Sequence, residues 1–155
     1  MLDLVLAVCC IIVGFFSGIK FAEKYTEKFK FYKSICFFNE QLYDEVVFFK
    51  NGIPSLKNND YLSIKFMKIL NEYARGNSIS ELLPTFLNVS QKNDISMYFE
   101  NIGKSDVSTQ KQLCVCYKNK FEHELQIAED EQRKYSSLCK KTGIIVGLII
   151  FIILF

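Results

Sequence analysis

Residues that interrupt helices are scarce in this chain. It has two prolines and seven glycines among 155 residues, and four of the glycines lie in the apolar segments at its ends. Proline removes a backbone donor and glycine costs conformational entropy, so a low content of both permits long helices with short connections. No segment alternates apolar and polar side chains as a half-buried strand does. The composition therefore predicts an all-α fold.

The residues that carry enzyme chemistry are also nearly absent. The chain has a single histidine, His123, which lies between Glu122 and Glu124 in an expected helix and is predicted to face solvent. It has no glycine-rich loop of the kind that binds phosphate, and no P-loop lysine motif. We therefore predict no catalytic residue, no cofactor and no enzymatic activity.

Metal and nucleic-acid sites are not indicated either. Cys114, Cys116 and His123 are the candidate metal ligands, but residues two apart on a helix point about 200° away from each other. The six cysteines are expected to act as small apolar side chains in a reducing compartment, and the acids of residues 122–131 as a solvated helix face. A formal net charge of only +2 provides no basic surface for a phosphate backbone. The sequence predicts no metal and no nucleic-acid partner.

Both ends of the chain are apolar, and the region between them is charged. Residues 4–19 and residues 143–155 contain no charged side chain. We interpret them as transmembrane helices, which divides the chain into a first span at residues 1–19, a helical domain at residues 20–141 and a second span at residues 142–155. The uncharged runs, 16 and 13 residues long, are shorter than the ~20 residues of a full span, so lysine stems would have to extend their reach. A cleaved N-terminal signal is the alternative, which the lack of a basic residue before the apolar run disfavours.

Lysines flank both apolar segments on their inner sides. These membrane-flanking basic residues are Lys20, Lys24, Lys28, Lys140 and Lys141. Because lysines next to a span are retained on the cytoplasmic side, they place the central domain in the cytoplasm and favour contact with anionic membrane lipid. Gly14 and Gly18, four residues apart in the first span, have the spacing of small residues that lets two helices pack closely.

Apolar residues between the two ends recur at intervals of three, four and seven, as on one face of a helix. In the first long helix this apolar stripe consists of Tyr25, Phe29, Tyr32, Ile35, Cys36, Leu42, Val46 and Phe49. The first long helix is expected to run from the first span to about Asn51, where Gly52 and Pro54 end it. Three short helices follow, over about residues 60–76, 79–87 and 93–103. Ser105 or Asp106 then begins a second long helix that runs into the second span. The prediction is a small domain of about five helices, two long and three short, flanked by N- and C-terminal transmembrane helices.

A series of short motifs runs along the chain in a recognisable order. The motifs are Met1, Leu2 and Leu4, then Ala22 and residues 24–28 (KYTEK), residues 45–49 (EVVFF), residues 52–56 (GIPSL), residues 102–106 (IGKSD), Gln110, Gln112, Lys140 and Gly143. In this order they resemble the stage III sporulation protein AB family of endospore-forming bacteria. The resemblance extends over essentially the whole chain.

The resemblance implies a membrane platform component of the channel between mother cell and forespore, similar to the F-type platform of type II secretion machines. Such a component would sit in the mother-cell membrane around the forespore, contact other channel subunits, and couple a cytoplasmic hexameric secretion ATPase to the channel. The expected docking residues are Gly103, Lys104, Ser105 and Asp106, although a helix end followed by a helix start explains the same turn.

Other functions remain open at the level of sequence. A passive membrane scaffold could recruit soluble proteins without an ATPase, and the chain could form a homo-oligomer. A pore subunit is disfavoured because the apolar segments hold no ionisable acid, lysine or arginine of the kind that marks ion paths.

Overall fold

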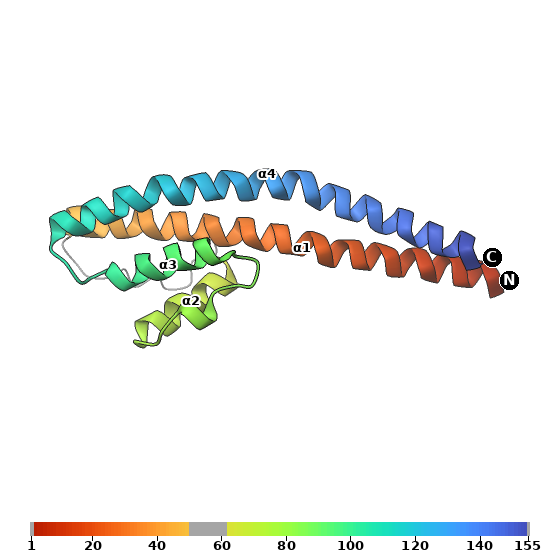
Figure 1. The fold of residues 1–155 in the computed structure, drawn as a ribbon, viewed down its shortest axis with the longest axis horizontal. Coiled ribbons are helices and arrows are strands. Elements are labelled where there is room, and N and C mark those ends of the chain that lie inside the picture. Colours follow the sequence, from red (N-terminus) through yellow and green to blue (C-terminus); the bar gives the residue numbers. More distant parts are fainter. Residues whose placement is uncertain (1, 50–61, 155) are drawn as a thin grey trace. The chain divides into compact units, whose positions relative to one another are not determined.

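A computed structural model describes residues 2–49 and 62–154 of the chain, and every regular element within those residues is helical (Figure 1). In chain order the elements are α1 (Leu2–Asp44), the π-helical turn η1 (Glu45–Phe49), α2 (Ile64–Ala74), the 3₁₀ turn η2 (Ser80–Leu82), α3 (Val89–Asn101) and α4 (Val107–Leu154). Two of the four α-helices are therefore long, with 43 residues in α1 and 48 in α4.

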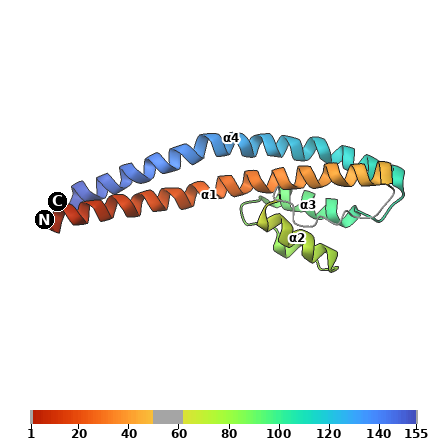
Figure 2. The same cartoon turned by 180° about the vertical axis from the view of Figure 1, so that it is seen from behind.

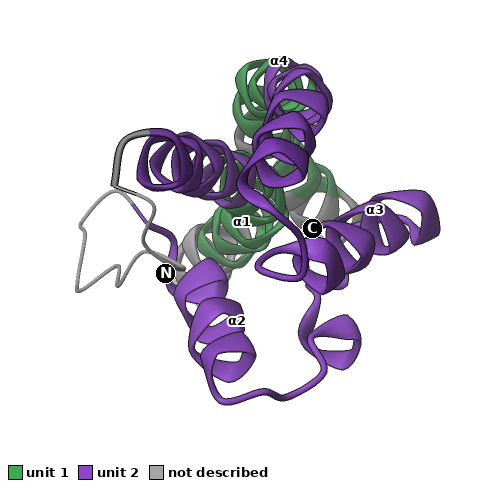
Figure 3. Ribbon diagram, turned by 90° about the vertical axis from the view of Figure 1, so that its left-hand side faces the viewer, with its two compact units in different colours: residues 1–29, 127–155 green, residues 30–126 purple. Residues whose placement is uncertain are grey.

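The chain divides into two compact units, which Figure 3 shows in different colours. Unit 1 comprises residues 1–29 and 127–155, and unit 2 comprises residues 30–126. Unit 1 holds the first part of α1 and the last part of α4, which lie side by side in Figure 1 and again, seen from behind, in Figure 2. Unit 2 holds the remaining parts of both long helices together with α2, η2 and α3.

The core of unit 2 is a cluster of aromatic rings drawn from all four α-helices. Phe38 of α1 lies 5.8 Å, centroid to centroid, from both Phe66 of α2 and Phe99 of α3. Tyr98 of α3 meets Phe121 of α4 edge to face at 5.1 Å. All five rings are buried. Aromatic side chains bury large apolar areas, and rings in edge-to-face contact add to that stability, so this cluster holds the short helices against the long ones.

A polar network is enclosed within this core. Asn39 is 2% exposed, and its amide nitrogen donates to the backbone oxygen of Cys114 at 3.0 Å. Its amide oxygen accepts from the Tyr98 hydroxyl at 2.8 Å. Burial raises the pKa of Tyr98 well above its ordinary value, so the hydroxyl keeps its proton for this bond. The network satisfies polar groups that would otherwise be costly to bury.

Each short α-helix begins at a side-chain cap. The Ser63 hydroxyl accepts from the backbone amide of Phe66, at 3.2 Å, and so starts α2. At the start of α3, the Asn88 side chain accepts from the Gln91 amide at 2.8 Å while the Gln91 side chain accepts from the Asn88 amide at 3.0 Å. This reciprocal pair is a capping box, which satisfies two donors that the first helical turn leaves unpaired.

The short elements differ in part from the sequence expectation. The helix expected over residues 79–87 is only the three-residue turn η2, and Pro84, which lacks a backbone donor, follows it. The helix expected from residue 93 begins earlier, at Val89, because Asn88 supplies the cap. The break expected at Gly52 and Pro54 lies outside the described residues, and α1 passes into η1 before it.

In unit 1, the two long helices touch backbone to backbone at glycines. A Cβ atom added to Gly18 would collide with the backbone oxygen of Cys139, and one added to Gly143 would collide with the backbone oxygen of Gly14. The Cβ on Gly143 would also lie 3.1 Å from the Gly18 Cα. Only glycine permits so close an approach, and dispersion contacts between the two backbones result from it.

The transmembrane part of the sequence prediction is wrong. Within residues 2–49 and 62–154, no helix combines the length and apolar content needed to cross a membrane. The reason is length: the uncharged runs at residues 4–19 and 143–155 reach only about 24 Å and 20 Å as helices, against a hydrocarbon core of about 30 Å. The spans assigned to residues 1–19 and 142–155 are therefore withdrawn.

Candidate functional site

The connection between α3 and α4 is a tight turn within unit 2. We call residues 103–106 the docking turn, since these are the residues expected to contact a partner. Gly103 has a φ of +75°, in the left-handed region that glycine adopts without strain. The Ile102 amide, at the C-cap of α3, donates to the Tyr98 oxygen at 3.2 Å. The helix thus ends in a backbone conformation that specifically favours glycine at residue 103.

Gln110, in the first turn of α4, stabilises the docking turn through three side-chain hydrogen bonds. It is 5% exposed, and its amide nitrogen donates to the backbone oxygen of Asn101 at 2.9 Å and to the Ser105 hydroxyl at 2.7 Å. Its amide oxygen accepts from the Gly103 backbone amide at 3.1 Å. One buried side chain therefore fixes both sides of the turn, which holds the exposed residues 103–106 in one arrangement.

Asp106 caps the start of α4. Its carboxylate accepts from the Thr109 hydroxyl at 2.6 Å and from the backbone amides of Ser108 at 3.0 Å and Thr109 at 3.4 Å. Bonds to the charged form favour ionisation, so the pKa of Asp106 lies below its ordinary value of 3.8, with the Thr109 hydroxyl as the largest cause. The cap is therefore complete at every pH above that ordinary value, and it is lost as pH falls through the lowered pKa.

Thr109→Val should move the pKa of Asp106 upward, toward 3.8, because it removes the hydroxyl that contributes most to the lowered value. Ser108→Ala is the matched control, since Ser108 contributes its backbone amide, which alanine keeps. Carboxyl carbon shifts of Asp106, followed by NMR as a function of pH, measure both. Equal pKa values in the two variants would show that the Thr109 hydroxyl does not stabilise the carboxylate.

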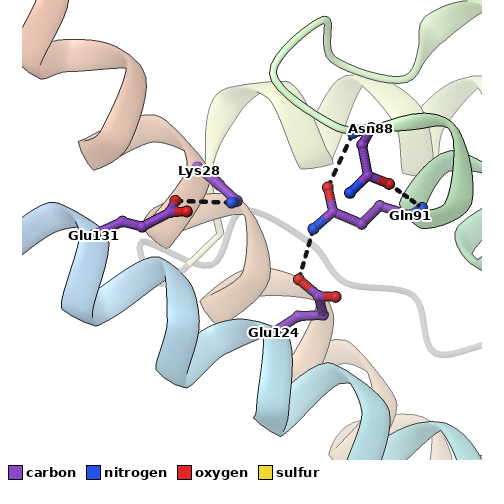
Figure 4. A network of polar contacts seen from close by, with 5 residues as sticks. All are labelled: Lys28, Asn88, Gln91, Glu124 and Glu131. Carbon is purple, nitrogen blue, oxygen red and sulfur yellow. Dashed lines mark hydrogen bonds and ion pairs between the residues drawn. The ribbon is translucent and has the colours of Figure 1, made fainter.

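A hydrogen bond and an ion pair connect α3 to α4, the two helices that the docking turn joins. Gln91 donates from its amide nitrogen to the Glu124 carboxylate at 2.6 Å (Figure 4), and Lys120 pairs with Asp94 at 2.6 Å. These contacts were not expected from the sequence. The spacing of Asn88 and Gln91 could have indicated the capping box, but nothing in the sequence reveals that Gln91 also reaches Glu124.

The expected membrane-flanking lysines belong to unit 1. Lys20, Lys24 and Lys141 are exposed, whereas Lys28 is partly buried and pairs with Glu131 at 2.8 Å (Figure 4). The side chain of Lys140 lies outside what the structure describes. The rings of Tyr25 and Tyr135, which are three and four residues away from Lys28 and Glu131 in the sequence, stack with their centroids 5.1 Å apart. The lysines expected to act alike therefore differ, because Lys28 is engaged within the unit.

Two of the described cysteines are at least partly buried in unit 2 and stay protonated. Burial raises the pKa of Cys36 to about 12 and that of Cys114 to about 11, so both stay protonated at neutral pH and lack the thiolate that a nucleophile needs. No group of three or more histidine, cysteine or acidic side chains within the described ranges could hold a metal ion.

Comparison with known proteins identifies the family. The family model of stage III sporulation protein AB matches residues 72–155, more than half of the chain, and this stretch includes α3, the docking turn and α4. No curated protein and no solved structure matches the chain. The match confirms the family that the sequence motifs indicated, and the motifs from residue 102 onward lie within the matched stretch. The chain therefore belongs to the stage III sporulation protein AB family.

Proposed function

We propose that this protein is a non-enzymatic, membrane-associated platform component of the apparatus between mother cell and forespore. Membership in its family implies a role in sporulation. In the proposed role, unit 2 faces the mother-cell cytoplasm and binds a secretion-type hexameric ATPase through the docking turn, and unit 1 associates with the membrane and with other channel subunits. The protein thereby couples the ATPase to the channel.

The observation that carries this proposal is the fixed geometry of the docking turn. Lys104, Ser105 and Asp106 are exposed although the backbone around them is held by Gln110. A surface that is ordered before binding loses little conformational entropy when a partner docks. The turn also presents a cation and an anion two residues apart, which suits a partner surface with charges in a complementary order.

The test is binding of the ATPase to the full chain and to two charge-reversed variants. Lys104→Glu should weaken binding about tenfold, since like charges at an interface are repulsive. The exposed Lys104 side chain makes no hydrogen bond or ion pair with the part of the chain that the structure describes, so the fold should be unchanged. Lys111→Glu, an equal change of charge at an exposed position of α4 outside the turn, is the control and should leave the affinity unaltered.

Two results would contradict the proposal. Equal affinity of the Lys104→Glu and Lys111→Glu variants would make residues 103–106 a helix connection and no more. No detectable binding of the unmodified chain would favour the passive scaffold, which recruits soluble proteins without an ATPase.

A further inference from the structure

Unit 1 carries an apolar groove between α1 and α4. The groove has a volume of about 640 Å³, within the range of sites that bind small molecules. Its walls include Val13 and Phe21 from α1 and Leu138 and Val146 from α4. The glycines at which the two helices touch, Gly14, Gly18 and Gly143, also line it. Gly18 and Gly143 contribute no side chain that would fill the groove.

The surroundings of the groove indicate which class of molecule covers it. Phe21 and Val13 are 70% and 65% exposed, and apolar side chains outside the groove, such as Phe16 and Ile145, are similarly exposed at 61% and 54%. A protein partner covers one apolar patch with a polar rim. Apolar side chains both in the groove and away from it instead suit hydrocarbon chains, which can cover every side.

An exposed cation, Lys24, lies just beyond Phe21, the last residue of α1 that lines the groove. Lys24 lies three residues after Phe21, hence on nearly the same face of α1, and makes no hydrogen bond or ion pair within the described residues. One turn further, Lys28 is neutralised by Glu131 at 2.8 Å. Lys20 is exposed as well, but its sequence position places it about a quarter turn away from the groove face.

We infer that this groove binds one acyl chain of an anionic phospholipid, with the lipid phosphate next to the Lys24 ammonium group. The apolar walls remove methylene groups from water, and the lysine supplies the opposite charge that the phosphate requires. This inference rests on the membrane association in the proposed function, and it is independent of ATPase docking. It specifies a lipid site and requires no crossing of the bilayer.

The test is titration of the full chain, kept in a mild detergent, with dioleoyl phosphatidylglycerol, followed by native mass spectrometry. The unmodified chain should bind one lipid saturably. Thr142→Phe places a ring in the groove and should lower the affinity about tenfold, because it displaces buried methylene groups. Ile145→Phe adds bulk to an exposed position that does not line the groove, and should leave the affinity unaltered.

A second pair of variants tests the contact between Lys24 and the lipid phosphate. Lys24→Gln should weaken phosphatidylglycerol binding about fivefold, and Lys20→Gln should change it little. Lys24→Gln should weaken binding of dioleoyl phosphatidylcholine less than that of phosphatidylglycerol, because the choline cation already offsets the phosphate charge of that lipid. A photoreactive phosphatidylglycerol that labels residues 13–21 and 138–146 of the unmodified chain supports the site even if Thr142→Phe fails to fold.

Three results would overturn the inference. Equal lipid affinity in the Thr142→Phe and Ile145→Phe variants would mean that lipid coats the unit without using the groove. Labelling spread evenly over the apolar residues would mean the same. Loss of a dimer in the Thr142→Phe variant, with lipid binding unchanged, would assign the groove to a second copy of this chain. None of these results bears on ATPase binding by unit 2.

Discussion

Phe99→Ala is expected to lower the free energy of unfolding of unit 2 by about 3–5 kcal/mol. Phe99 is 1% exposed, and its ring lies within 6.3 Å, centroid to centroid, of four others. Those rings are Phe38, Phe66, Tyr73 and Tyr98. Removing Phe99 leaves a cavity between three helices that are already held by capping and by the Asn39 network, so the cavity can collapse only in part.

Hydrogen exchange of the full chain measures this loss, since the amides of α2 and α3 report the free energy of opening of unit 2. Met97→Ala is the matched control. Met97 lies two residues earlier on α3 and is 47% exposed, so its truncation should change protection by no more than about 0.5 kcal/mol. Equal losses in the two variants would show that the aromatic cluster is not the core that holds α3.

The sequence stripe of α1 predicted only part of this core. The stripe included Tyr32, Ile35 and Leu42, which are buried, but it omitted Phe38 and Asn39, which are buried as well. A single stripe describes a helix that contacts neighbours on one side. In unit 2, α1 is contacted by the rings of α2 and α3 through Phe38 and by the backbone of α4 through Asn39, so its buried face is wider.

The docking turn was more accessible to sequence reasoning because its signals are local. Glycine after a helix and aspartate before the next one are preferences of single positions, and both hold here, with Gly103 at positive φ and Asp106 as the cap. The role of Gln110 could not be predicted in the same way. Its bonds to Asn101, Gly103 and Ser105 depend on the path of the turn, which the spacing of residues does not determine.

The error at the two apolar ends has a different origin. An uncharged run indicates that a segment avoids water, but it does not indicate whether lipid or another helix of the protein contacts the segment. Residues 4–19 and 143–155 lack the length of a span, and the structure pairs parts of both segments with each other through glycine. The spacing of Gly14 and Gly18 suggested close packing, yet a pattern within one helix cannot identify its partner, which here includes Gly143.

Gly143→Val is expected to force α1 and α4 apart in unit 1 at a cost of about 1–3 kcal/mol. The added side chain would collide with the backbone oxygen of Gly14, and backbone atoms cannot turn aside as a flexible side chain can. Spin labels on the exposed positions Phe16 and Ile149, in a background without reactive cysteines, should report a longer and broader distance distribution. Ile145→Val, at an exposed position of α4, is the control and should leave the distribution unchanged.

The glycine pair also predicts how two substitutions combine. Gly18→Ala collides with the backbone oxygen of Cys139, and Gly143→Ala collides with that of Gly14, so each alone must separate the same two helices. Once one substitution has moved the two helices apart, the methyl group added by the other substitution no longer collides with the opposite backbone. The double variant should therefore cost clearly less than the sum of the single variants, as expected for residues that share one contact. Additive costs would mean that the two glycines relax independently and that no common crossing holds unit 1 together.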